Sequence, residues 1–393
     1  MGQNTDDSSG IKKYGFPRHL LEANDEEKKI YFENIIVEHK FLKEAIEKTL
    51  RHITTHVSER LIFICGPSGI GKKAFINILK DRIFEIYNPI RSNNPGVIPF
   101  VDVEAMAPEQ GSFNFRMLWK MILTKLQEPM LEAKISYRVD NGYDLNGKPI
   151  LISRAQKAEY QEVLQNTLKY RDVKALLINE AQHLLRVSGG KKANESVEQL
   201  KSLVNGSQTP VILVGTYELT TYLDDLSNVV TDQINQRARI IHFPCYHQNI
   251  KSEVIEFGKA AKLLLRSMPL EQTPEMLVDD DWKYFYQYSL GCIGVLKIWF
   301  MDAFSFALSL GATTLTKEHL EETRISGQRC SFMLQRIIEG ENKMIKILSD
   351  GDISARLGFN EVDSGKPESE NHKQGYNRKP FERNPKRDKV DVG

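Results

Sequence analysis

Five short apolar runs lie between residues 61 and 244, and stretches with apolar residues at helical spacing separate them. Apolar strands that alternate with helices are typical of a mostly parallel sheet covered by helices on both faces. The pattern therefore predicts an α/β fold with a five-stranded, mostly parallel sheet flanked by helices. The predicted strands cover residues 61–65, 97–105, 175–181, 210–216 and 240–244.

Helical periodicity predicts the remaining elements. A helix at about 38–55 precedes the first strand, and an insertion at about 128–157 separates the second strand from the third. After residue 247 the pattern is helical, which divides the chain into an α/β core over 13–247 and a small helical lid domain over 248–355. The lid helices are expected at 249–267, 279–289, 294–310, 317–325 and 329–350.

Both ends of the chain are polar. Residues 1–12 and 356–393 are predicted to be disordered, because they contain too little apolar surface to offset the entropy of ordering. The last third of 356–393 is basic and carries Tyr376 and Phe381. Such a tail can tether a protein to DNA, fold on a partner, or only increase solubility, and all three alternatives stay open.

Composition narrows the class of protein. Of the 393 residues, 41% are hydrophobic and 27% are charged, which is ordinary for a soluble globular chain. The net charge of +1 excludes a polycation that coats nucleic acid, so any contact with DNA must come from local patches. The sequence has no membrane-length apolar run and no targeting signal, and we therefore expect a cytoplasmic protein without membrane association.

The four cysteines are scattered along the chain. Cys65, Cys245, Cys292 and Cys330 show no CxxC pair and no metal-ligand spacing. We therefore expect no zinc site and no disulfide framework, but four reduced and mostly buried thiols.

A glycine-rich loop, "GPSGIGKK", lies directly between the first predicted strand and a helix. Its spacing fits a phosphate-binding loop, in which backbone N–H groups and the helix N-terminus attract a polyphosphate. Lys72 would reach the terminal phosphates, but Lys73 stands where the pattern requires Ser or Thr. The candidate nucleotide contacts are Gly66, Pro67, Ser68, Gly69, Ile70, Gly71, Lys72, Lys73 and Ala74.

The third predicted strand ends in Asn179 and Glu180. P-loop ATPases place an acidic residue at this strand end to hold Mg²⁺, and many add a glutamate that orients the attacking water. Asn179 replaces that acid, and Lys73 replaces the hydroxyl that ligates Mg²⁺. An ammonium at ~4 Å from a phosphate contributes about 4 kcal/mol at an effective dielectric of about 20, but it cannot bridge two phosphates as the ion does. With ATP and Mg²⁺ as the expected cofactors, hydrolysis is predicted to be slow or absent.

Further polar residues follow the fourth strand and accompany the fifth. Thr216 could contact the γ-phosphate or the attacking water, or simply begin a turn. Arg237 and Arg239 stand just before the fifth predicted strand, where an arginine can be donated to the phosphate of a neighbouring subunit. Each of these arginines could equally form a surface ion pair.

In this order, the motifs resemble those of the AAA+ ATPases, and within them the TnsC/TniB branch, which regulates DNA transposition and is related to MuB. The resemblance covers about 30–350 and is carried by "NEAQHL", "LVGTYEL", "FNFRMLWKMILTKLQEP" and "SLGCIGVLKIWFMDAFSFAL". It implies assembly on duplex DNA as a ring or filament that links a TniQ/TnsD-type target selector to a transposase or its companion nuclease. The implied roles are Lys72 as phosphate lysine, Glu180 as catalytic glutamate, Thr216 as first sensor, Arg237 or Arg239 as finger and Lys297 near the second sensor.

Two basic clusters are candidate DNA contacts, although each could be an ordinary solvated face. One follows the Glu180 strand and the other lies on the helix after the second strand. Because the sequence shows no base-reading element, we expect contacts with phosphates and little sequence preference. The first cluster contains Arg186, Lys191 and Lys192, and the second contains Arg116, Lys120 and Lys125.

Two other functions remain open at this point. One is a scaffold that binds ATP without hydrolysing it. The other is a different AAA+ DNA ATPase, such as an initiator or a helicase loader. That second alternative calls for a C-terminal DNA-reading domain, which residues 356–393 are too short and too polar to form.

Overall fold

The structure is a computed structural model that describes residues 15–55, 60–107, 113–129, 153–185, 193–220, 238–272 and 274–348. The predictions for 1–12, for 356–393 and for most of the insertion at 128–157 concern residues outside these ranges.

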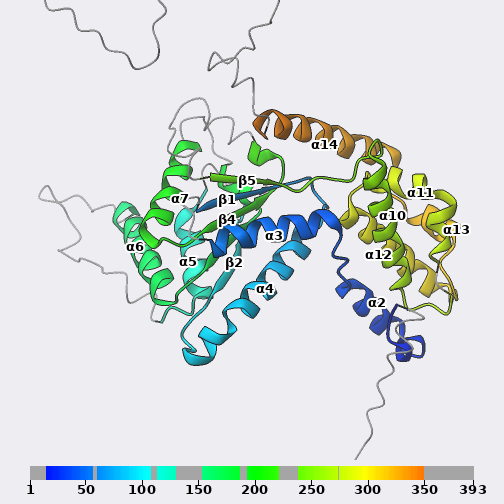
Figure 1. Ribbon diagram of the computed structural model, residues 1–393, viewed down its shortest axis with the longest axis horizontal. Coiled ribbons are helices and arrows are strands. Elements are labelled where there is room, and N and C mark those ends of the chain that lie inside the picture. Colours follow the sequence, from blue (N-terminus) through cyan, green and yellow to red (C-terminus); the bar gives the residue numbers. More distant parts are fainter. Residues whose placement is uncertain are drawn as a thin grey trace, which may run out of the picture. The chain divides into compact units, whose positions relative to one another are not determined.

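Five strands form one sheet in the order β2-β3-β4-β1-β5 (Figure 1). Every pairing in the described part of the chain is parallel, so the strands all end at the same edge of the sheet. The predicted α/β fold is confirmed, and the residues that follow β1, β3 and β4 meet at that edge. The strands are β1 Leu61–Cys65, β2 Phe100–Glu104, β3 Ala175–Asn179, β4 Val211–Gly215 and β5 Ala238–His242.

Successive residues of β1 face opposite sides of the sheet. Phe63 packs with one group of helices, whereas Ile62 and Ile64 pack with another. All five residues of β1 are buried, which explains why the sequence shows a continuous apolar run there. The first group comprises α5 Phe115–Lys125, α6 Ser153–Tyr170 and α7 Ala193–Ser207, and the second comprises α3 Lys40–Thr54 and α4 Lys72–Asn93.

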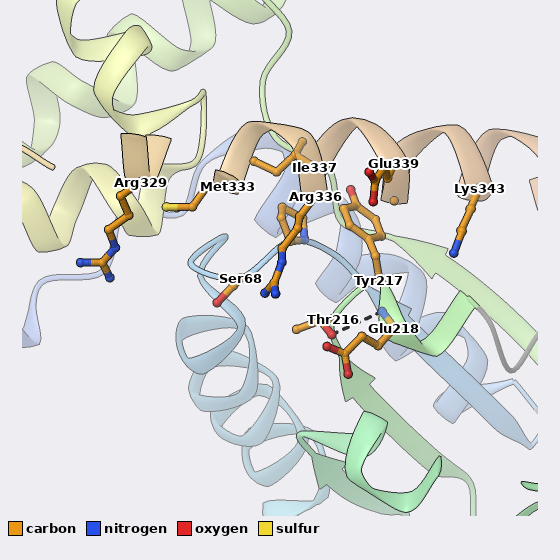
Figure 2. A pocket seen from close by; sticks show the side chains of 12 residues that line it. Ser68, Thr216, Tyr217, Glu218, Arg329, Met333, Arg336, Ile337, Glu339 and Lys343 are labelled. Atoms are coloured by element: carbon orange, nitrogen blue, oxygen red, sulfur yellow. Dashed lines mark hydrogen bonds between the residues drawn. The ribbon is translucent and has the colours of Figure 1, made fainter. Parts of the chain in front are cut away.

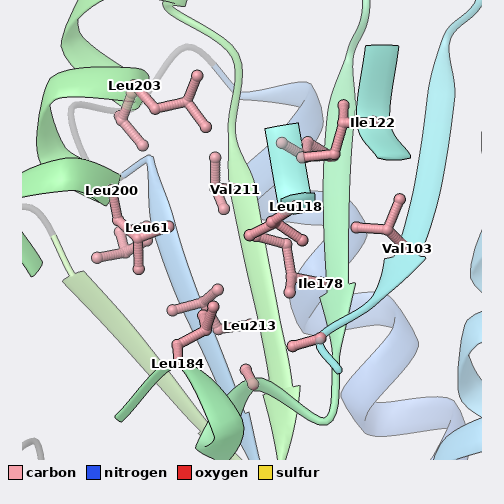
Figure 3. Close-up of a cluster of buried hydrophobic side chains, with 14 of the residues drawn as sticks. Leu61, Val103, Leu118, Ile122, Ile178, Leu184, Leu200, Leu203, Val211 and Leu213 are labelled. Carbon is pink, nitrogen blue, oxygen red and sulfur yellow. The ribbon is translucent and has the colours of Figure 1, made fainter. Parts of the chain in front are cut away.

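Figure 3 shows the first of these two clusters. Leu118 and Ile122 of α5 and Leu200 and Leu203 of α7 are buried together with Val211 of β4. Burying one such leucine contributes about 1.5–3 kcal/mol to stability. The cluster therefore fixes the sheet on which the loops at its carboxyl edge are built.

A second region, made of helices, follows β5. Its core contains Phe257 and Trp299, and Phe32 from α2 packs into the same cluster. The sequence pattern does not predict α2, because its residues are mostly charged and Phe32 is its buried position. The helices of this region are α2 Asp25–Asn34, α10 Lys251–Arg266, α11 Met276–Ser289, α12 Ile293–Ser309, α13 Lys317–Thr323 and α14 Gly327–Leu348. Two short 3₁₀ helices lie elsewhere along the chain: η1 Arg18–Leu21 precedes α2, and η2 Ala181–Leu185 directly follows β3.

The last helix, α14, returns to the sheet. Ile337 and Met344 are buried in the two clusters that flank the sheet, one in each. Between them, a Cβ atom on Gly340 would lie 2.1 Å from Cδ2 of Tyr217, the second residue after β4. The absence of a side chain at Gly340 thus lets α14 pack directly against the end of β4.

One prediction about the cysteines is wrong. Cys245, which follows β5, forms a disulfide with Cys292, the N-cap of α12, across 47 residues of sequence. The fold places these two segments side by side, since the N–H of Tyr246 donates to the carbonyl of Gly291 at 3.0 Å. Spacing along the sequence gives no sign of that proximity. Cys65 and Cys330 are free and buried, as expected.

Within the described ranges, no helix is by itself long and apolar enough to cross a membrane. The helix pair Asp281–Ser289 and Ile293–Ser309, bent by 105°, meets the length and composition requirement only when its two members are taken together.

Candidate nucleotide-binding site

The glycine-rich loop joins β1 to α4 in the conformation that phosphate binding requires. Gly69 and Gly71 have φ angles of +78° and +112°, and glycine adopts this left-handed region without a steric penalty. Gly71 is the N-cap of α4, so the first turn of that helix directs its free N–H groups toward the loop. The loop therefore offers backbone donors and a helix N-terminus to an anion.

Lys72 lies in the first turn of α4 and reaches back over the loop. Its Nζ donates to the carbonyl oxygens of Gly66 at 3.2 Å and Pro67 at 2.7 Å. Burial lowers the pKa of Lys72 to about 8, although the charge of Glu180 opposes that shift. An anion beside this ammonium would stabilise its charged form.

The lowered pKa of Lys72 makes nucleotide affinity depend on pH. The free protein loses the Lys72 proton as the pH rises through about 8, whereas a bound polyphosphate raises the pKa and keeps the proton. We expect ATP affinity to be nearly constant between about pH 7 and 8 and to fall above that by at most about tenfold per pH unit. Calorimetric titrations at several pH values would measure this. Lys72→Arg should flatten the profile, because its guanidinium stays charged; equal slopes for the two proteins would contradict the assignment.

Glu180 and Thr216 are connected through Gln182, a residue to which the motifs assign no role. Gln182 donates from Nε2 to Oε2 of Glu180 at 2.5 Å, and its Oε1 accepts the N–H of Thr216 at 3.3 Å. The Gln182 side chain is only 5% exposed, so both partners are fixed by a buried group. The carboxylate of the predicted catalytic glutamate and the end of β4 therefore form one hydrogen-bonded unit. "NEAQHL" contains Gln182, but a sequence motif does not reveal this bridge.

The two unusual residues differ in their surroundings. The Oδ1 atom of Asn179 is buried and accepts no hydrogen bond from the described protein, so it suits a water or a ligand donor. Lys73 places an ammonium where Mg²⁺ would need an oxygen ligand. No cluster of three or more His, Cys, Asp or Glu that could hold a metal occurs among the described residues. This set of donors does not fit a Mg²⁺ ion that the protein itself ligates.

Lys297 lies in α12 close to the loop. The N-terminus of α12 packs on the loop, since a Cβ atom on Gly294 would lie 2.3 Å from the carbonyl oxygen of Gly69. The Nζ of Lys297 donates to the carbonyls of Glu33 and Ile35, each at 2.6 Å, at the end of α2. Burial, and then the charge of Lys73, lower the pKa of Lys297, while Glu33 opposes them. The ammonium is thus engaged by backbone oxygens, and its contact with nucleotide stays a prediction.

A pocket of about 470 Å³ opens beside the loop (Figure 2). The phosphate-binding loop and the residues after β4 form one wall, and α14 forms the other. Arg329, Arg336 and Lys343 recur every seven residues along α14 and so lie on one face of it. The lining residues are Pro67, Ser68, Thr216, Tyr217, Glu218, Arg329, Met333, Arg336, Ile337, Glu339, Gly340 and Lys343.

Of the remaining candidates that the structure describes, Arg239 and the three cations of α5 do not line this pocket. Arg239 lies within β5 rather than before it, and its side chain is exposed. On α5, Arg116 lies over the ring of Tyr160, with 5.5 Å between its Cζ and the ring centroid. Lys120 shares that face, but Lys125 is about two and a half turns from Arg116 and points to the opposite side. The α5 cluster is therefore divided between two faces. Arg186, Lys191, Lys192 and Arg237 lie outside the described residues.

A comparison with protein-family models agrees with the geometry of the nucleotide-binding site. Residues 55–223 match the model of a family described as AAA domain. This segment has the fold of an AAA domain. The matched segment includes the phosphate-binding loop, Glu180 and Thr216. This confirms the AAA+ part of the resemblance, whereas the TnsC/TniB branch stays a prediction.

Several solved structures are similar to the chain at low identity. The ORC2 protein of Aeropyrum pernix in ADPNP and ADP complexes is 15% identical with a TM-score of 0.48, over 74% of this chain and 69% of that chain. The Walker-type ATPase of Pyrococcus abyssi is 13% identical with a TM-score of 0.43, over 80% of this chain and 76% of that chain. Drosophila ORC bound to DNA is 14% identical with a TM-score of 0.45, over 82% of this chain and 68% of that chain. No curated protein sequence matches the chain.

Proposed function

We propose that the protein binds ATP at the loop between β1 and α4 and hydrolyses it slowly. The observation that carries this proposal is the meeting of Lys72, Glu180 and Thr216 at one sheet edge, with Gln182 joining the last two. The match to the AAA domain family supports the same ligand.

In this proposal, some residues of the chain bind the phosphates and others position the attacking water. Loop N–H groups and Lys72 hold the phosphates, and Glu180 orients a water for attack on the terminal one. Mg²⁺, when it accompanies ATP, supplies charge neutralisation to the phosphates. Lys73 supplies positive charge but no oxygen, and Asn179 supplies an oxygen without a negative charge. ATP is therefore better suited to serve as a ligand that changes the state of the protein than as a rapidly consumed fuel.

We propose further that the ATP-bound chain assembles on duplex DNA and regulates transposition, with a target selector of TniQ/TnsD type and a transposase or its companion nuclease as partners. The motifs that carry this resemblance also build the site. Gln182 of "NEAQHL" bridges Glu180 and Thr216, and Gly294 of "GCIGVLK" packs on the phosphate-binding loop.

ATP-dependent assembly tests this second proposal. The full chain would be incubated with linear duplexes of unrelated sequence, in the presence of ATP, ADP or no nucleotide, and examined by electron microscopy and sedimentation. We expect oligomers on DNA with ATP, similar for all duplexes and weakened by salt because phosphate contacts release counterions. Tight ATP binding without any association with DNA at low salt would favour an ATP-bound scaffold that acts elsewhere.

A further inference from the structure

The pocket between α14 and the phosphate-binding loop contains three cations from a single helix face. Figure 2 shows Arg336 extending from α14 toward Ser68 and Thr216, with Arg329 and Lys343 on either side along the helix. The carboxylates of Glu218 and Glu339 also line the pocket, and Glu339 accepts a hydrogen bond from Gln335 at 2.8 Å. The lining therefore carries more positive than negative charges, as an anion site requires.

The anchoring of α14 fixes where Arg336 can reach. Its neighbour Ile337 is buried, and Gly340 packs directly against Tyr217. At the next turn, Glu341 lies 3.2 Å from Nε2 of His247, whose Nδ1 lies 2.9 Å from Glu253. These contacts anchor α14 to the core along the turn that follows Arg336, and the Arg336 side chain projects into the pocket from this anchored part of the helix.

The pocket adjoins the part of the site that would surround the last phosphate of a nucleotide. Ser68 belongs to the loop, and Thr216 is tied to Glu180 through Gln182. On the proposed function, the terminal phosphate would lie between Lys72 and these groups. The other basic candidate, Lys297, is engaged by the carbonyls of Glu33 and Ile35.

We propose that Arg336 contacts the terminal phosphate of ATP from within the same chain, so that α14 docks more tightly on a triphosphate than on a diphosphate. This inference rests on the proposed ATP site. A guanidinium offers a fixed charge and two parallel donors, which suit phosphate oxygens. Its positive charge would replace part of the charge that a protein-ligated Mg²⁺ ion brings to the phosphates in other P-loop sites. Because only the triphosphate reaches Arg336, the contact gives the helix a differential affinity for the two nucleotide states.

Equilibrium binding of ATP and ADP tests the inference. We expect Arg336→Ala to weaken the binding of ATP by about 10- to 100-fold, which is the usual effect of losing a hydrogen bond to a charged group. The affinity for ADP should stay within about twofold of that of the unmodified protein. Arg82→Ala, which removes an exposed arginine from the middle of α4, is the matched control and should change the affinity for neither nucleotide. Gly340→Val, which undocks α14, should also abolish the preference for ATP while ADP still binds.

The two proposals fail in different ways. If the unmodified protein binds ADP and ATP but Arg336→Ala changes both equally or neither, the ATP site stands and the role of Arg336 is wrong. If the unmodified protein binds neither nucleotide, the proposed function and this inference both fall. Retained ADP binding in each variant shows that its phosphate-binding loop is folded.

Discussion

Replacing Lys73 with Thr and Asn179 with Asp in one protein is expected to raise ATP turnover with Mg²⁺ by about 10- to 100-fold, because a well-held metal stabilises the transferred phosphoryl group by several kcal/mol. The hydroxyl would ligate the ion, and the carboxylate would hold its water shell. On the proposed function, the Glu180 carboxylate, which accepts a hydrogen bond from Gln182, would orient the attacking water in both proteins. The measurement is phosphate release at saturating ATP, with and without duplex DNA.

Three comparisons make that experiment decisive. Each single substitution should raise turnover less than the pair, since the two residues act on the same ion. Glu180→Gln in the restored protein should return turnover to the starting level. If instead the unmodified chain already turns over ATP as fast as the restored one, and Glu180→Gln alone stops it, then other groups hold Mg²⁺ and the slow-hydrolysis proposal is wrong.

The sequence predicted the fold because the three central strands, β1, β3 and β4, are buried on both faces of the sheet. A continuous apolar run such as "LIFIC" is typical of a strand in a sheet that helices cover on both faces. The observed strand ends differ from the predicted ones by three residues or fewer. The phosphate-binding loop was equally predictable, since its glycines and Lys72 act through local backbone geometry. The position of Glu180 and Thr216 at one sheet edge followed from parallel strands.

Contacts between distant segments were not predictable from the sequence. Lys297 has a helical neighbourhood that predicts exposure, yet its ammonium is held by carbonyls some 260 residues earlier in the chain. Cys245 and Cys292 pair because the segment after β5 meets the start of α12. Arg336 looked like one charge among many on an amphipathic helix. Its relation to Ser68 depends on the docking of α14, which periodicity cannot reveal.

Removing the Lys72 ammonium is expected to have the largest effect on binding. Lys72→Ala deletes the cation whose Nζ lies against the loop carbonyls, and with it the charge-assisted bonds to the nucleotide. Two such bonds correspond to a loss of ATP affinity of about 100-fold or more. Lys80→Ala is the matched control, because Lys80 lies on the same helix and its exposed side chain pairs with Asp102 at 3.8 Å. That substitution should leave affinity unchanged.

A single titration shows whether this loop holds ATP. Labelled ATP would be titrated onto the unmodified chain, Lys72→Ala and Lys80→Ala at about pH 7.5, where most of the Lys72 side chains are protonated given their pKa of about 8. The account predicts one ATP per chain for the unmodified protein and Lys80→Ala, with similar affinities, and binding about 100-fold weaker for Lys72→Ala. Equal affinity for all three proteins, or no binding by the unmodified chain, would contradict it.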